Sequence, residues 1–191
     1  AYFGMVKCID DNVGQILQTL REQELLDETI IVFTADHGDL CGEHGRLNKG
    51  VPYEGSARIP FLIHCPGKIV PGTTVHEALT CIDFLPTVMS MLGVEVPHTV
   101  DGRDASPLFT GALTDWHDVA IIRSTSSRTP WISVIDQHHK LVYSSVEQPW
   151  LLDLKNDPSE VVNQFDNPDL KSKVASMTRE LRKYGRAHSD P

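Results

Sequence analysis

The sequence predicts an α/β fold in two parts: a portion of a doubly wound sheet, followed by a small antiparallel sheet with a packed terminal helix. An apolar run, residues 30–33, ends at a carboxylate, an imidazole and a glycine, as buried strands end at the ligand-binding edge of a covered sheet. After about Ala112 the chain changes to short strand-like runs with polar turns between them. We therefore expect two domains, residues 1–112 and 113–191.

The first expected element is a helix over roughly residues 1–26. Its apolar positions recur at the three- and four-residue spacing of a helix that packs by one face. We expect it to lead into the strand at 30–33, which is interpreted as buried on both faces in a parallel sheet because its apolar residues do not alternate with polar ones. The helical apolar positions are Met5, Ile9, Val13, Ile16, Leu17 and Leu20.

A second strand and a second helix are expected next. The strand covers 59–64 and ends before Pro66, which begins a Pro-Gly pair that breaks regular structure. The helix follows Asp83, a residue type that caps helices, and it has Pro86 in its first turn. Gly93 lies just past its expected end.

The second part of the chain predicts a compact unit of four strands and one helix. Asn167 can cap that helix, and Pro168 is tolerated at its start. The expected strands are 119–123, 131–136, 140–143 and 150–154, and the apolar stripe of the helix consists of Leu170, Val174, Met177 and Leu181.

Composition limits the classes of partner. The chain has 191 residues, 40% of them hydrophobic, which is enough for a moderate core. Its net charge of −9 disfavours nucleic acid and anionic membrane as partners, since both require a basic surface. No apolar run approaches membrane-spanning length. The 4 cysteines are irregularly spaced and are interpreted as small core residues rather than as a disulfide framework, which is compatible with a reducing compartment.

Asp36 and His37 are the candidate metal ligands. They follow an apolar strand directly, at the strand end where ligands gather in α/β sheets. Gly38 comes next and is interpreted as permitting a sharp turn where a side chain would obstruct an ion or a substrate. Lys49 lies in the polar, glycine-rich loop that follows, together with His44. A cation facing an anionic substrate is what sulfate or phosphate transfer requires.

These residues resemble the type I sulfatases of the alkaline phosphatase superfamily, and almost the whole chain is covered in the family's order. The resemblance implies an alkaline phosphatase-like sheet whose carboxyl-terminal part is residues 1–112, with 113–191 as the small α+β subdomain. The segments that carry it are 2–14, Thr34-Ala35-Asp36-His37-Gly38-Asp39, Lys49, 53–60, Asp83-Phe84-Leu85-Pro86-Thr87, Asp101-Gly102-Arg103 and 150–160.

The resemblance implies roles for four residues. Asp36 and His37 would bind a divalent metal ion, Ca, Mn or Mg. Many relatives have asparagine at the position of His37, whereas the histidine resembles the subset with choline sulfatase and phosphonate monoester hydrolases. Imidazole favours Mn, as well as Zn or Fe, over Ca, which prefers oxygen. Lys49 would meet the charged group of the substrate as a catalytic and binding residue, and His44 is a candidate substrate contact.

Two further implications concern structure and completeness. Tyr53, Glu54 and Arg58 are expected to fix the loop onto the sheet through a structural ion pair. The family's nucleophile is a formylglycine made from a cysteine in a Cys-x-Pro-Ser-Arg type motif, and none of the cysteines here lies in such a motif. We therefore expect the nucleophile and further ligands in a missing N-terminal portion of the same protein, and we expect this chain alone to be inactive.

The expected function of the whole protein is hydrolysis of a small sulfate monoester. Phosphonate monoester or phosphodiester hydrolysis remains an alternative, because those enzymes share the Asp-His pair and the lysine. A non-catalytic domain, lacking the nucleophile, is the alternative from a different class.

Overall fold

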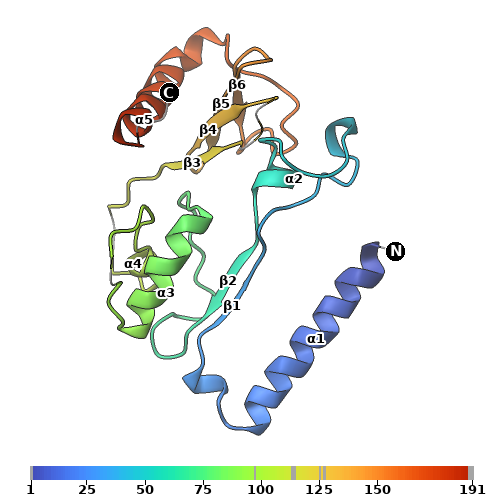
Figure 1. The fold of residues 1–191 in the computed structure, drawn as a ribbon, viewed down its shortest axis with the longest axis vertical. Coiled ribbons are helices and arrows are strands. Elements are labelled where there is room, and N and C mark those ends of the chain that lie inside the picture. The colour runs from blue at the N-terminus through green and yellow to red at the C-terminus, as the bar shows by residue number, and fades with distance from the viewer. Residues whose placement is uncertain (1, 97, 113–114, 125, 127, 189–191) are drawn as a thin grey trace. The chain divides into compact units, whose positions relative to one another are not determined.

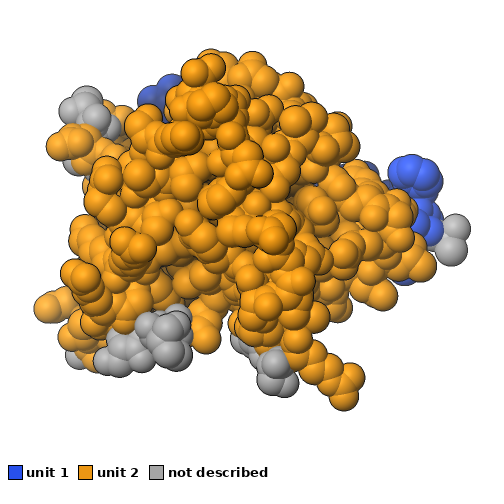
Figure 2. Space-filling model, turned by 90° about the horizontal axis from the view of Figure 1, so that it is seen from above, with its two compact units in different colours: residues 1–34, 61–73 blue, residues 35–60, 74–191 orange. Residues whose placement is uncertain are grey.

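The computed structural model describes residues 2–96, 98–112, 115–124, 126 and 128–188. The chain divides into two compact units, which Figure 2 distinguishes by colour: residues 1–34 with 61–73, and residues 35–60 with 74–191. The domain boundary expected between 112 and 113 falls at residues outside the described part. Each unit is considered by itself below.

The order of elements follows the sequence-based expectation closely (Figure 1). The helices are α1 (Tyr2–Glu22), α2 (Glu54–Ala57), α3 (Phe84–Leu92), α4 (Ser106–Phe109) and α5 (Lys171–His188). The strands are β1 (Ile31–Thr34), β2 (Phe61–His64), β3 (Ala120–Arg123), β4 (Trp131–Ile135), β5 (His139–Ser144) and β6 (Trp150–Asp153).

The first unit corrects two expectations. β1 pairs with β2 in an antiparallel ladder, not a parallel one, with Ile31 opposite His64. It is also not buried on both faces, since Phe33 is 42% exposed. An apolar run does not encode the direction of its partner strand or whether this chain supplies the cover for its faces. For the same reason the helix predicted to pack by one face exists as α1, yet none of its described residues is buried.

The second unit contains the predicted small sheet, and this expectation is confirmed. Strands β3, β4, β5 and β6 lie in sequence order and are all antiparallel. Helix α5 packs on this sheet and begins at Lys171, three residues later than the predicted start at Pro168. The predicted cap residue Asn167 instead caps a short 3-10 turn, Pro168–Leu170, which leads into α5, and its side chain accepts a hydrogen bond from the amide of Asp169. The core between sheet and helix is formed by Val134, Leu141, Leu151, Met177 and Leu181.

One face of this sheet packs against α5, and the other carries a different set of side chains. Side chains alternate across a strand, so Leu141, which packs toward α5, is followed and preceded by residues that point the other way. Lys140 is one of these, and the register places Trp131 and Trp150 on the same side as Lys140. We call the side that carries Trp131, Lys140 and Trp150 the loop face.

Helix α3 shows a different use of its expected cap. The Asp83 carboxylate does not cap α3; it accepts hydrogen bonds from the amides of Thr80 and Arg103, at 3.0 and 2.7 Å. Gly93 ends the helix as predicted, with a left-handed φ of 69°. Of the cysteines, Cys65 is buried, whereas Cys8, Cys41 and Cys81 are exposed, so the expectation that they are core residues was wrong for these three. No helix in the described part of the chain is long and apolar enough to span a membrane.

Candidate functional site

Asp36 and His37 lie directly after β1 and expose their side chains, at 87% and 41%. The ring atom Nδ1 of His37 lies 2.8 Å from the carbonyl oxygen of Gly38. Because a carbonyl can only accept, Nδ1 carries the proton, and the lone pair of the neutral ring is on Nε2. That Nε2 lies 3.6 Å from Oδ2 of Asp36. An oxygen donor and a nitrogen donor thus stand side by side and open to solvent.

This pair fits part of a metal site. Carboxylate oxygen and neutral imidazole are both ligands of divalent ions, and the hydrogen bond to Gly38 fixes the ring as outer-shell partners of metal-binding histidines do. In the described residues no group of three His, Cys, Asp or Glu side chains is placed to hold a metal ion. Asp36 and His37 together offer one oxygen and one nitrogen as possible ligand atoms.

Gly38 is needed for a reason other than the predicted sharp turn. Its amide donates a hydrogen bond to the carbonyl of Ser56, at 2.9 Å. A Cβ at this position would lie 2.1 Å from the carbonyl oxygen of Gly55. Any side chain would therefore push the two backbones apart. The absence of a side chain lets the Asp36-His37 segment pack directly against α2.

The segment that carries Lys49 is hydrogen-bonded to the same region. The amide of Leu40 donates to the carbonyl of Asn48 at 2.9 Å, beside Lys49. The N–H and the thiol of Cys41 hold the pKa of the Asp39 carboxyl below its usual range, and the charge of Lys49 acts in the same direction. The fold thus brings the candidate ligand segment and the Lys49 segment together, with Lys49 exposed.

His44 belongs to a stack of three rings. Its imidazole lies flat against Tyr53, with ring centroids 3.7 Å apart and planes 9° apart. Tyr53 in turn stacks on Trp150 of the loop face, at 5.2 Å and 24°. Burial raises the pKa of the Tyr53 hydroxyl. The stack holds His44 by its face and leaves its ring nitrogens at the edge, where polar contacts are made.

A buried ion cluster ties the loop to the small sheet. Nζ of Lys140 lies 2.6 Å from Oε1 of Glu54 and 2.7 Å from Oε1 of Glu160. It also donates to the carbonyl of Pro52, at 2.7 Å. The other oxygen of Glu160, Oε2, accepts from the amide of Glu54 at 2.6 Å. The side chains of Lys140 and Glu160 are 0% and 2% exposed.

The expected structural ion pair between Glu54 and Arg58 exists, at 3.9 Å, although the Arg58 side chain is 79% exposed. Glu54 also forms a second, shorter ion pair with the buried Lys140. Sequence reasoning missed Lys140 and Glu160. The signal in the sequence was weak, because Lys140 stands at the start of the expected strand 140–143, next to His139, and nothing near it in sequence indicates the distant carboxylates of Glu54 and Glu160.

Trp131 adds a further anchor from the loop face. Its indole Nε1 donates a hydrogen bond to the carbonyl of Gly50, at 3.0 Å. Gly50 follows Lys49 directly, so this bond anchors the backbone next to Lys49. The loop face thus holds the Lys49 loop through Trp131, Lys140 and Trp150.

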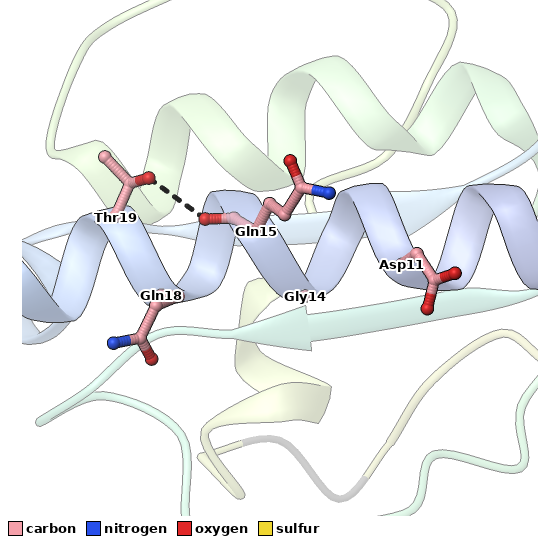
Figure 3. Close-up of a pocket in the computed structure, with 5 residues that line it drawn as sticks. All are labelled: Asp11, Gly14, Gln15, Gln18 and Thr19. Carbon is pink, nitrogen blue, oxygen red and sulfur yellow. Dashed lines mark hydrogen bonds between the residues drawn. The ribbon is translucent and has the colours of Figure 1, made fainter.

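A shallow depression on α1 is not a second candidate site. Figure 3 shows that its lining residues all come from one helix. The hydroxyl of Thr19 donates a hydrogen bond to the carbonyl of Gln15, at 3.0 Å. Among the described residues that line it, Asp11 alone is titratable. The lining residues are Asp11, Gly14, Gln15, Gln18 and Thr19.

Comparison with known families gives two matches. Residues 42–187, most of the chain, match the family described as N-sulphoglucosamine sulphohydrolase, C-terminal. Residues 1–69 match a family described as a protein of unknown function.

Similar proteins point the same way. The choline-sulfatase of Rhizobium meliloti is 34% identical over 100% of this chain and 37% of its own length. BT4656, solved in complex with its substrate D-glucosamine-2-N,6-O-disulfate, is similar with a TM-score of 0.85 and 29% identity over 97% of this chain and 40% of that one. The phosphonate monoester hydrolase of Agrobacterium radiobacter has a TM-score of 0.81 and 27% identity, over 98% and 41%. The expected fold class is confirmed. The chain spans about two fifths of the length of such relatives.

Proposed function

Since this chain belongs to the type I sulfatase family, within the group described as N-sulphoglucosamine sulphohydrolase, C-terminal, we propose that the whole protein hydrolyses sulfate monoesters. Membership implies in general a metal ion and a formylglycine nucleophile. The substrate is proposed to be a small sulfate ester, and the partner of this chain the N-terminal portion of the same protein, which would carry the nucleophile. The division into domains 1–112 and 113–191 is likewise our proposal.

Asp36 and His37 are proposed as metal ligands. The supporting observation is the hydrogen bond from Nδ1 of His37 to Gly38, which leaves Nε2 free 3.6 Å from the Asp36 carboxylate. An imidazole ligand favours Mn over Ca, because Ca prefers oxygen. When bound, such an ion withdraws charge from the sulfate oxygens.

Lys49 is proposed to neutralise the charge that develops on the transferred group and the leaving oxygen. An ammonium on an exposed, backbone-anchored loop can meet an anion without a large desolvation cost. His44 is proposed as a substrate contact through the edge of its stacked ring, where a nitrogen can donate to a hydroxyl or a sulfate oxygen.

The nearest second function is hydrolysis of phosphonate monoesters or phosphodiesters. The similarity to the Agrobacterium radiobacter enzyme supports it, and the arrangement of Asp36, His37 and Lys49 suits either anion. The alternative from a different class is a non-catalytic domain. For this chain taken alone it is supported by the lack of a Cys-x-Pro-Ser-Arg type motif in the sequence.

Kinetics on the full-length protein test the proposal. We expect turnover of an aryl sulfate, and Lys49→Ala should lower kcat/KM by about two to three orders of magnitude, the scale of a lost preorganised electrostatic contact. Thermal stability should stay nearly unchanged, because Lys49 is exposed. Lys155→Ala, at another exposed lysine, is the matched control.

A substrate panel separates the candidate functions. Faster turnover of a phosphonate monoester or a phosphodiester than of sulfate esters would favour the second function. Full activity of Lys49→Ala, or loss only through unfolding, would remove the lysine from the site.

A further inference from the structure

The buried ion cluster includes a residue, Glu160, with an unfavourable backbone conformation. Glu160 has a left-handed backbone, with φ at 54°, although it is not glycine. Such a conformation is sparsely populated and persists where the surroundings enforce it. Here the Asp157 carboxylate does so, accepting from the amide of Val161 at 2.9 Å. The turn thereby directs the Glu160 carboxylate inward to Lys140 and to the amide of Glu54.

The ion cluster contacts the start of α2 through hydrogen bonds and an ion pair. Pro52 offers its carbonyl, and Glu54 offers both its amide and its carboxylate. Two residues further along α2 is Ser56, which is 4% exposed. Its carbonyl accepts from the amide of Gly38, and its hydroxyl accepts from the amide of Gly50, at 3.1 Å. One short helix therefore connects the ion cluster to both functional segments.

We propose that Lys140, Glu160 and Ser56 are positioning residues: the ion cluster orients α2, and Ser56 holds the segment of Asp36 and His37 in register with the segment of Lys49. This inference rests on the proposed function, because it assumes that those segments form one site. None of the three positioning residues is required to touch substrate.

The expected benefit is accuracy of placement. Lys49 lies in an exposed loop rich in glycine, and such a loop gains conformational freedom when its anchors are lost. A displacement of about 1 Å in a catalytic group can cost about a hundredfold in rate. Buried ion clusters contribute little net stability compared with apolar packing, whereas they can specify one arrangement.

Hydrogen–deuterium exchange in the full-length protein tests the positioning directly. Ser56→Ala removes the acceptor for the amide of Gly50 but keeps the carbonyl that serves Gly38. Exchange at Gly50 should therefore accelerate about tenfold or more, with Gly38 little changed. Lys140→Met should accelerate both amides. Ser133→Ala is the matched control, since Ser133 is also a buried serine, 1% exposed, but lies in β4.

Kinetics on the same variants test whether the positioning serves the reaction. Ser56→Ala should lower kcat for an aryl sulfate by about tenfold or more with a smaller change in KM, because Lys49 acts on charge that develops in the transition state. Ser133→Ala should keep kcat. A variant that is merely destabilised would show a reduced active fraction and no selective exchange at Gly50.

The outcomes separate the two claims. Unchanged exchange at Gly50 in Ser56→Ala, or faster exchange with unchanged kcat, would overturn the positioning role. A wild-type protein that hydrolyses no sulfate, phosphonate or phosphodiester would overturn the proposed function. In that case the positioning role would be judged without turnover, from amide exchange at Gly38 and Gly50 and from Mn affinity measured by calorimetry. Unchanged Mn affinity in Lys140→Met would overturn the positioning role.

Discussion

Replacing Lys140 with methionine removes a fully buried cation and leaves its carboxylate partners in place. The Lys140 side chain is 0% exposed, and that of Glu160 is 2% exposed, so Glu160 would stay buried with its charge uncompensated. Glu54 is 22% exposed and can regain water, so most of the penalty falls on Glu160. Breaking a buried ion pair on one side costs about 3–5 kcal/mol, and we expect Lys140→Met to lower the free energy of unfolding by that amount.

Urea unfolding of the full-length protein, followed by tryptophan fluorescence, measures this loss. Adding Glu160→Gln to Lys140→Met removes the uncompensated carboxylate, so the double variant should recover about 1–2 kcal/mol. Lys155→Met, at an exposed lysine, should change the free energy of unfolding by less than about 0.5 kcal/mol. A loss below about 1 kcal/mol for Lys140→Met would show that the cluster is solvated, and the reasoning would fail.

Four further outcomes are expected. The isolated chain should show no aryl sulfate turnover above background, and robust hydrolysis would refute this. Asp36→Ala in the full-length protein should weaken Mn binding at least about tenfold in calorimetry, and unchanged affinity would remove Asp36 from the shell. Burial, aided by the charge of Lys173, lowers the pKa of His139, so the neutral ring contributes stability above the unfolded pKa near 6.5 that is lost as pH falls toward the folded pKa. His139→Asn should flatten the change in Tm between pH 7.5 and 5.5; an unchanged slope would contradict the assignment. Leu151→Ala should cost about 3–5 kcal/mol in the same urea assay, and a loss under 1 kcal/mol would mean that its core relaxes fully.

The features that the sequence predicted well are those with a local cause. The strands of the small sheet follow from short apolar runs between polar turns, and Asn167 caps the 3-10 turn that leads into α5 through the amide of Asp169, two residues along the chain. Gly93 ends α3 because its backbone is left-handed there, a conformation that glycine adopts easily since it has no side chain. The stripe that packs α5 follows from helical periodicity alone. None of these depends on a partner distant in the chain.

What the sequence did not predict depends on partners far along the chain. The direction of β1 is set by β2, and Glu54 has, besides the nearby Arg58, a closer and buried partner in Lys140 on the small sheet. Asp83 turns its carboxylate to the amide of Arg103 instead of capping the helix that it precedes. Proximity in sequence favoured the wrong partner in the case of Asp83, and for Glu54 it gave no sign of Lys140. For the candidate site, Asp36, His37 and Lys49 were predicted from residue type and stay predictions, whereas the anchors that hold their segments were not foreseen.

The contact between Gly38 and Gly55 limits how this site can change. A backbone-to-backbone approach, in which a Cβ would come within 2.1 Å of the Gly55 carbonyl, leaves no side chain to exchange for a larger or smaller one. The spacing between the Asp36-His37 segment and α2 is therefore invariant to substitution, in contrast to a spacing set by packed side chains. A change in the proposed site would therefore have to come from residues bordering this backbone contact rather than from the contact itself.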